Sequence, residues 1–119
     1  MQFDNNIPIY IQLVEAMKLQ IIAGELKPGE RIPSVRELAM THKVNPNTMQ
    51  KALLELEEMG LIYTERTNGK FVTEDEGLIA KHKKAYADTL TRNFLDAMAT
   101  IGFDAEAAAA YLREMEEEP

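Results

Sequence analysis

The sequence feature that most constrains the fold is a series of helix caps and helix breakers within residues 32–71. Ser34 is a residue type that caps helices, and Glu37 follows three positions later, which is the spacing of a capping box. We expect the helix that begins here to be short, because the Thr-His-Lys-Val sequence of residues 41–44 should break it.

A second helix is expected to begin at Asn45-Pro46 and to end at Gly60. Asparagine is a good N-cap, and proline suits the first helical position, where its missing N–H costs no hydrogen bond. Glycine ends helices because it accepts a left-handed backbone conformation. Between these ends the apolar residues recur at helical spacing, which predicts a buried face made of Met49, Ala52, Leu53 and Leu56.

Two strands are predicted after the second helix, at residues 61–63 and 70–72. Between them, Thr67-Asn68-Gly69 contains the dipeptide Asn-Gly, which is a strong hairpin signal. Upstream, Arg31-Ile32 is expected to add a short third strand to this hairpin. Two short helices joined by a turn and followed by a hairpin form a winged helix-turn-helix.

The second helix presents polar side chains away from its apolar face, namely Asn47, Thr48, Gln50 and Lys51. Such groups can hydrogen-bond base edges and phosphates in a DNA groove. The alternative is an ordinary solvated face, as on many surface helices. We favour DNA binding because the capping box, the Asn-Pro start and the hairpin all agree with it.

These residues also resemble a known family. The segment Pro28–Ala39, PGERIPSVRELA, resembles the signature of the GntR family of bacterial transcription regulators, and so does Val44–Leu53, VNPNTMQKAL. The short tail is similar to that of the YtrA-like subfamily. The resemblance covers residues 7–73 strongly, and the tail by length and helical character only. It implies a winged helix-turn-helix that binds double-stranded DNA.

The resemblance also implies particular DNA contacts. Arg36 matches a DNA-contacting arginine of the family, Thr48 matches a DNA-contacting threonine, and Asn47 matches the polar residue before it. Pro46 stands where some relatives have a base-contacting arginine, so that contact is absent here. Gln50 also stands where some relatives have arginine, and glutamine pairs with adenine rather than with guanine.

Alternatives stay open for several of these residues. Arg36 could form a salt bridge with Glu37 or another acid, and Ser34 could act only as a helix cap. Lys51 could be merely solvated, and the Asn-Gly pair could serve the hairpin alone. The full set of predicted DNA-binding residues is Ser34, Arg36, Asn45, Asn47, Thr48, Gln50, Lys51, Arg66, Thr67, Asn68, Gly69 and Lys70.

An amphipathic helix is predicted near the N-terminus, from Pro8 to Ala23, with Gly24 after it. The preceding residues, Met1 to Asn6, are expected to be loosely held. The apolar face of the helix contains Ile9, Leu13, Met17 and Ile21 at steps of four, with Tyr10 and Val14 beside them. We expect this face to be buried behind the helix-turn-helix.

Composition argues against several other functions. The 119-residue chain has no cysteine and two histidines, so neither a disulfide framework nor a cysteine–histidine metal site is expected. No phosphate-binding loop, nucleophile motif or metal-ligand spacing occurs, so we expect neither an enzyme nor a cofactor. No segment is apolar enough to cross a bilayer and no signal peptide is expected, which predicts a cytoplasmic protein.

The formal net charge of −7 is unusual for a protein that binds DNA, because a basic domain is the common pattern. Residues 1–73 carry −1 and residues 74–119 carry −6, so the acidity lies mainly in the tail. We therefore expect modest non-specific affinity for DNA and a steep loss of binding with added salt.

We divide the chain into a winged helix-turn-helix DNA-binding domain, residues 1–73, and a helical dimerisation tail, residues 74–119, with a junction at residues 73–77. The tail should contain a long helix ending at Gly102 and a second helix capped by Asp104. The apolar stripe of the long helix is predicted to be Leu78, Ile79, Tyr86, Leu90, Phe94, Met98 and Ile101. That of the second is predicted to be Ala107, Ala108, Tyr111, Leu112 and Met115, before an acidic end at Glu114, Glu116, Glu117 and Glu118.

Two helices of this size cannot bury such stripes alone, so we predict a homodimer. Its interface is expected to contain Tyr86, Leu90, Phe94, Met98, Tyr111 and Leu112. A dimer would also present two recognition helices to half-sites about one turn of DNA apart. Any small-molecule effector is expected to bind at the dimer interface or between tail and winged domain, because the tail is too short to enclose a large pocket.

The predicted fold class is mainly α with a small antiparallel sheet: a winged helix-turn-helix followed by a two-helix dimerisation tail. The predicted function is that of a sequence-specific DNA-binding transcription regulator, a repressor by default, although the sequence does not distinguish repressor from activator. The alternative is a winged-helix module for protein–protein assembly without DNA binding. Such a module would expose apolar residues where this chain has Asn47, Gln50 and Arg66.

Overall fold

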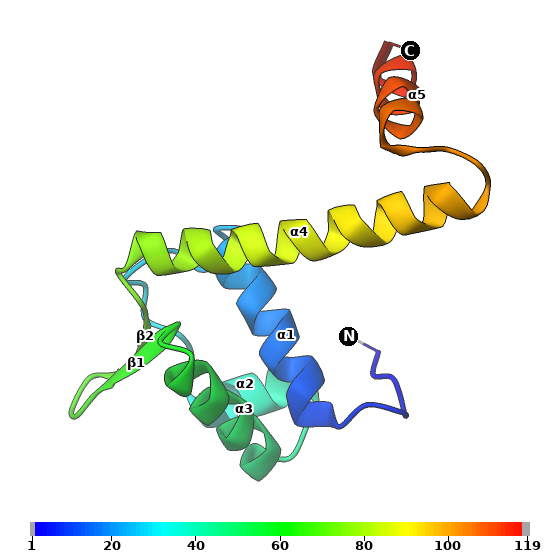
Figure 1. Cartoon of the computed structure of the whole chain (residues 1–119). Coiled ribbons are helices and arrows are strands. Elements are labelled where there is room, and N and C mark those ends of the chain that lie inside the picture. The colour runs from blue at the N-terminus through cyan, green and yellow to red at the C-terminus, as the bar shows by residue number, and fades with distance from the viewer. Residues whose placement is uncertain (1, 118–119) are drawn as a thin grey trace. The chain divides into compact units, whose positions relative to one another are not determined.

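The computed structural model describes residues 2–117 and contains five helices and a two-stranded sheet within that range (Figure 1). Predictions that fall on Met1 and Glu118 lie outside the described residues. The chain forms two compact units. The first, which we call the winged unit, extends up to Lys83, and the second, which we call the tail unit, begins at Lys84. The elements are α1 (Ile9–Ile22), α2 (Val35–His42), α3 (Pro46–Glu58), β1 (Ile62–Glu65), β2 (Gly69–Val72), α4 (Glu76–Thr100) and α5 (Ala105–Glu117). The mainly helical α+β fold agrees with the prediction.

The core of the first unit lies where α1 packs against α3. The apolar stripe predicted for α3 is completely buried, as are most residues of the α1 stripe. Ile9 is the exception, with 43% of its surface exposed, because it is the first residue of α1 and lies beyond the packed part of that helix. The largest fully buried side chains are Leu13, Met17, Ile21, Met49, Leu53, Leu56, Leu61, Ile62 and Val72.

The predicted caps define the helix-turn-helix. The Ser34 hydroxyl accepts a hydrogen bond from the Glu37 backbone N–H at 3.2 Å and donates one to the Glu37 carboxylate at 3.1 Å. The first helix is longer than predicted, since α2 continues to His42. It ends only at Lys43, whose φ of 56° makes it the one non-glycine residue with positive φ among residues 2–117. This left-handed turn, rather than a break from residue 41, connects the two helices.

The hairpin lies where it was predicted. The third strand predicted at Arg31-Ile32 is only a single β-bridge. β1 and β2 pair antiparallel with Glu65 opposite Gly69, so three residues form the tip. Arg31 forms a single bridge to Phe71 and no regular strand. The physical reason is that the chain turns into α2 at Ser34, immediately after a proline that has no N–H to donate.

The first unit extends beyond the predicted junction. Asp75 caps α4 by accepting a hydrogen bond from the Leu78 N–H at 3.0 Å, and Gly77 lies inside the helix. Leu78 and Ile79 pack against the core of the first unit, which explains why this unit continues to Lys83. These two residues were predicted as part of the tail stripe, and the structure assigns them to the winged unit instead.

The second unit contains the rest of α4 and α5. The Asp104 carboxylate accepts a hydrogen bond from the Ala107 N–H at 2.8 Å, as predicted for a cap. Phe103 packs edge-on against Tyr111, with ring centroids 5.7 Å apart. Of the residues described in this unit, only Ala108 is fully buried, so most of the predicted apolar stripe stays accessible to solvent.

Candidate nucleic-acid interface

The surface predicted to face DNA begins at the N-terminal end of α3. The Asn45 side chain accepts a hydrogen bond from the Asn47 N–H at 2.7 Å, which fixes the start of the helix. Because the opposite stripe is fully buried, the polar face of α3 is directed to solvent. Asn47 and Gln50 are exposed and Thr48 is half-buried. Their amide and hydroxyl groups are therefore accessible to a ligand.

Lys51 follows on the same helix but its ammonium is held by α1. Its Nζ lies 4.0 Å from the centroid of the Tyr10 ring, which is a cation–π distance. Lys51 is thus neither freely solvated nor directed solely toward a ligand. It extends the positive surface of α3 toward the start of α1.

Arg36 stands in the first turn of α2 and is exposed. It forms no ion pair with any residue in the described part of the chain, and the Glu37 carboxylate is engaged by the Ser34 hydroxyl instead. The salt bridge to Glu37 considered as an alternative is therefore absent. An unpaired guanidinium is suited to bind a phosphate or the guanine edge in bidentate fashion.

The tip of the hairpin, or wing, consists of Arg66, Thr67 and Asn68, and all three are exposed. The Asn68 amide donates a hydrogen bond to the Glu65 carboxylate at 3.0 Å, which closes the turn. Gly69 follows with a φ of 100°, a conformation that other residues adopt only at a cost. The tip therefore projects a cation and small polar groups with little steric bulk.

Beside the wing lies a groove of about 300 Å³ that sequence reasoning missed. Its lining combines the start of α2 with both strands, including Ser34, Thr64, Arg66 and Gly69. Arg31 also lines it, and the Nε–Nη2 edge of its guanidinium faces Gly69: a Cβ built on that glycine would be 3.2 Å from Nε and 3.3 Å from Nη2. Arg31 was interpreted only as a strand residue, and no local pattern would have revealed this position.

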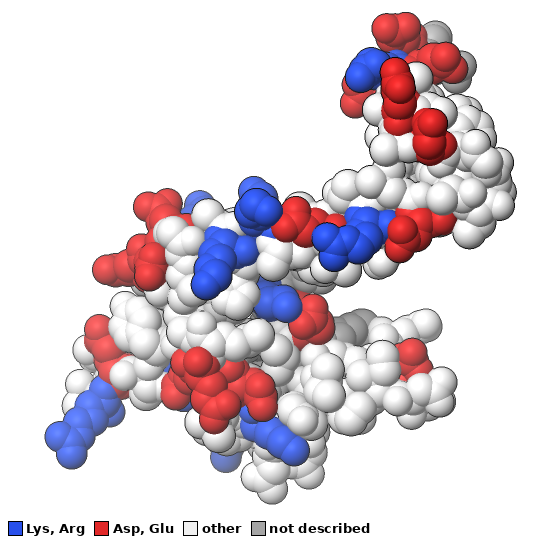
Figure 2. All heavy atoms as spheres, in the orientation of Figure 1, with Lys and Arg blue, Asp and Glu red and all other residues white. Residues whose placement is uncertain are grey.

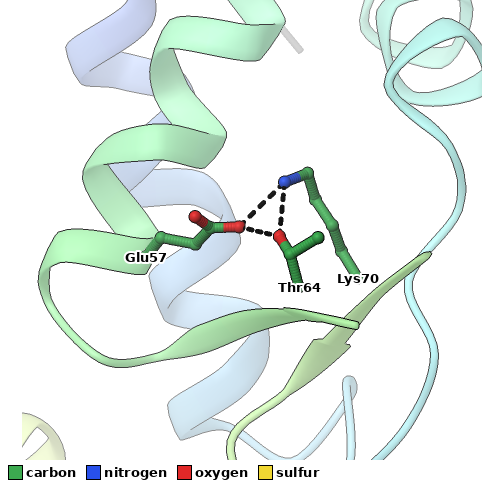
Figure 3. Close-up of polar contacts among 3 residues, drawn as sticks. All are labelled: Glu57, Thr64 and Lys70. Atoms are coloured by element: carbon green, nitrogen blue, oxygen red, sulfur yellow. Dashed lines mark hydrogen bonds and ion pairs between the residues drawn. The ribbon is translucent and has the colours of Figure 1, made fainter. Parts of the chain in front are cut away.

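Lys70 is not free, in contrast to the other predicted wing cation (Figure 3). Its Nζ lies 2.8 Å from the Glu57 carboxylate and 2.8 Å from the Thr64 hydroxyl. The Thr64 hydroxyl in turn donates to the same Glu57 oxygen. Hydrogen bonds from Lys70 and Thr64 hold the pKa of Glu57 below its ordinary value. This set of three contacts links α3 to both strands of the wing.

The other face of the wing is aromatic. Tyr63 and Phe71 are directly opposite in the sheet and stack with centroids 5.6 Å apart. Partial desolvation of the Tyr63 hydroxyl, followed by the negative charges of Glu74 and Glu65, raises the pKa of Tyr63. Stacking of this pair stiffens the hairpin.

Charge is unevenly distributed over the first unit. Figure 2 shows basic atoms at the tip of the wing and acidic atoms gathered over α3. The acids of α3 are Glu55, Glu57 and Glu58, all in its C-terminal half. The N-terminal half of the helix, which carries the amides and Lys51, has no acid. A polyanion is therefore best accommodated at the start of α3 and at the wing.

This fold and this surface define a winged helix-turn-helix protein of the DNA-binding type. Comparison with known proteins agrees, because residues 9–72 match the model of the bacterial regulatory proteins of the gntR family. The chain therefore belongs to the GntR family, and it is a DNA-binding transcriptional regulator rather than an enzyme.

Similar proteins extend this result. An uncharacterized HTH-type transcriptional regulator, YhcF of Bacillus subtilis, is 34% identical over 88% of this chain and 87% of its own length. The HTH-type transcriptional repressor YtrA of the same organism is 47% identical over 57% of this chain, which spans about half (52%) of YtrA.

Solved structures include a GntR family transcriptional regulator from Listeria monocytogenes, 40% identical, with a TM-score of 0.84 over 94% of this chain and 98% of that one. The AraR DNA-binding domain in complex with an operator is 30% identical, with a TM-score of 0.55 over 61% of this chain and 88% of that one. The similarity to the Listeria protein includes both compact units, and the similarity to AraR is confined to about the length of the winged unit. No helix within residues 2–117 is long and apolar enough to span a membrane.

Proposed function

We propose that the protein is a cytoplasmic repressor that binds a two-half-site operator as a homodimer. The observation that carries this proposal is the combination of an exposed polar and basic surface on the winged unit with an exposed apolar surface on the tail unit. The first suits DNA and the second suits another copy of the chain. Two of the similar proteins are named transcriptional repressors, which supports repression rather than activation.

On the DNA side, we assign residues to base contacts or to phosphate contacts according to where the structure places them. Asn47, Thr48 and Gln50 stand at the exposed start of α3, where a recognition helix contacts base edges in the major groove. Ser34 and Asn45 are occupied as caps, so they bring backbone N–H groups rather than free side chains to a phosphate. The remaining contacts to phosphates or to the guanine edge are assigned to Arg36, Lys51, Arg66, Thr67, Asn68 and the Gly69 backbone.

On the dimer side, α4 and α5 leave an apolar groove of about 360 Å³ within the tail unit. Leu90, Phe94 and Leu112 line it, and Leu90 and Leu112 are 52% and 48% exposed. Tyr111 is also exposed, whereas Tyr86 and Met98 are half-buried. A second copy would cover these surfaces symmetrically, and the two winged units would then contact two half-sites.

The test is DNA selection followed by fluorescence anisotropy. The wild-type protein is used to enrich a duplex from a random-sequence pool, and a scrambled duplex serves as the control. Binding is expected to be tight for the enriched duplex only, with two protomers per duplex. Arg36→Ala should weaken binding by about 1–3 kcal/mol, the range for loss of a good base or phosphate contact.

Two further variants make the result specific. Arg92→Ala removes the same charge from an exposed position on α4, and it should leave the affinity nearly unchanged. Gln50→Ala should change the base preference at one position of each half-site. If the wild-type protein enriches no duplex and still forms a dimer, the repressor proposal is refuted and a protein–protein assembly module is favoured.

A further inference from the structure

The contacts among Glu57, Thr64 and Lys70 form the outermost connection between α3 and the wing; we name this set the wing lock (Figure 3). Thr64 and Lys70 are directly opposite in the sheet. Side chains alternate along a strand, so these two share a face with Ile62 and Val72, which are buried in the core. The wing lock therefore continues the core-facing side of the hairpin by one step toward the tip.

Beyond the wing lock, no hydrogen bond or ion pair joins the hairpin to α3 in the described part of the chain. Arg66, Thr67 and Asn68 are exposed, and the hydrogen bonds of Asn68 return to Glu65 within the hairpin itself. The direction in which the tip projects is consequently set by the wing lock, by the core pair behind it, and by Arg31, which bridges Phe71 and packs against Gly69. The recognition helix α3 and the wing tip must bind the same duplex. Their joint affinity is higher when their separation is fixed before binding, because less conformational freedom is then lost.

We propose that Glu57 and Lys70 are positioning residues for DNA binding, which orient the wing relative to the recognition helix, and that Lys70 does not itself bind a phosphate. The inference rests on the proposed function, since it concerns binding to DNA. The Lys70 ammonium has two partners within 2.8 Å, and its side chain is only 19% exposed. A partly exposed ion pair contributes little to folding stability, so the main effect of the wing lock is on binding.

Removing the carboxylate separates this proposal from the simpler alternative. If Lys70 contacted a phosphate, Glu57 would compete with DNA for the lysine, and Glu57→Gln would strengthen binding. If the wing lock positions the wing, Glu57→Gln weakens binding although it removes a negative charge from a helix that faces a polyanion. The two alternatives therefore predict opposite signs.

Matched variants complete the design. Glu58→Gln removes the same charge from the adjacent, exposed residue, which has no ion pair in the described part of the chain, and it should not weaken binding. Thr64→Val removes two of the three contacts of the wing lock without any change of charge and should weaken binding. Lys70→Met should weaken it too, and the double variant Glu57→Gln/Lys70→Met should be no weaker than Lys70→Met alone.

The experiment is anisotropy with the duplex that the wild-type protein enriches, across a salt series, on variants whose thermal unfolding is first measured by circular dichroism. We expect Glu57→Gln and Thr64→Val each to weaken binding by at least about fivefold, the lower end for coupled sites. Glu57→Gln should also reduce the salt dependence, although it removes no cation, because the displaced tip loses a phosphate contact.

The outcomes are separable. Equal or tighter binding by Glu57→Gln, with the wild-type protein binding normally, overturns this inference and leaves the proposed function in place. Independent, additive losses in the double variant overturn it as well. Failure of the wild-type protein to enrich any duplex overturns the proposed function, and this inference with it.

Discussion

Replacement of Leu112 by glutamine tests whether the exposed apolar surface of the tail unit holds two copies together. Glutamine keeps the side-chain length and the helix propensity of leucine, so α5 should persist. Full burial of a leucine side chain contributes about 1.5–3 kcal/mol. Leu112 is still 48% exposed in one copy, so about half of that contribution, roughly 1 kcal/mol, is available to an interface.

A symmetric dimer uses each residue twice, so the expected loss is about 2 kcal/mol, or roughly a 30-fold rise in the dimer dissociation constant. Sedimentation equilibrium over a concentration series measures this constant directly. Operator affinity should fall in parallel at protein concentrations near the new dimer dissociation constant, because two half-sites are then bound less often by one dimer.

Met40→Gln is the matched control, because Met40 is an apolar residue of α2 in the winged unit and is 73% exposed. Met40→Gln should leave the dimer dissociation constant unchanged. Equal dimer constants for wild-type protein and Leu112→Gln would refute the proposed interface. A loss of equal size in Met40→Gln would show that the dimer forms through the winged unit instead.

Three further changes test the winged unit itself. Ser34→Ala removes the cap of α2 and should lower the free energy of unfolding by about 1 kcal/mol in urea titrations; no change would contradict the cap. Gly69→Ala places a Cβ 3.2 Å from Arg31 at a φ of 100°, so stability should fall by about 1–2 kcal/mol in the same assay and DNA affinity should fall as well; retention of both would show that the wing accommodates a side chain. Lys70 lowers the pKa of Glu57 from 4.5. The ion pair therefore contributes its full stabilisation of the fold above pH 4.5, and this stabilisation is lost as the pH falls through the lower pKa of the folded state. Acid titration should therefore destabilise wild-type protein more than Glu57→Gln over this range, by no more than about 1 kcal/mol for a partly exposed pair, and a greater loss in Glu57→Gln would contradict the ion pair.

The helix-turn-helix could be predicted because its signals are local. Ser34 with Glu37, Asn45 with Pro46, and Gly60 each act within one turn of a helix, so their chemistry can be interpreted from neighbouring residues. The buried stripe of α3 followed from helical periodicity in the same way. Even here the exact end of α2 was wrong, since a left-handed Lys43 is not a common residue choice for a helix end.

The candidate site was less predictable because its side chains are organised by contacts across elements. Lys70 and Glu57 are separated by thirteen positions, and only folding of the hairpin onto α3 brings them to 2.8 Å. Arg31 meets Gly69 across the sheet bridge, and Leu78 reaches the core from a helix that composition assigned to the tail. Periodicity shows which face a residue is on, but it does not identify the residue opposite.

The distribution of positive charge explains why the geometry of the wing matters for a protein of net charge −7. In the winged unit, Lys18 and Lys70 are paired with acids and Lys51 is held over Tyr10. Among the cations of the predicted DNA-binding set and of the groove beside the wing, Arg31, Arg36 and Arg66 are then neither ion-paired nor held over an aromatic ring. Three phosphates per protomer and two protomers correspond to about six phosphates, with a salt slope of roughly 0.9 for each. With so few charges, non-specific attraction to DNA is weak, and affinity depends on making all of these contacts at once. A wing fixed relative to α3 meets that requirement, and a freely moving wing would not.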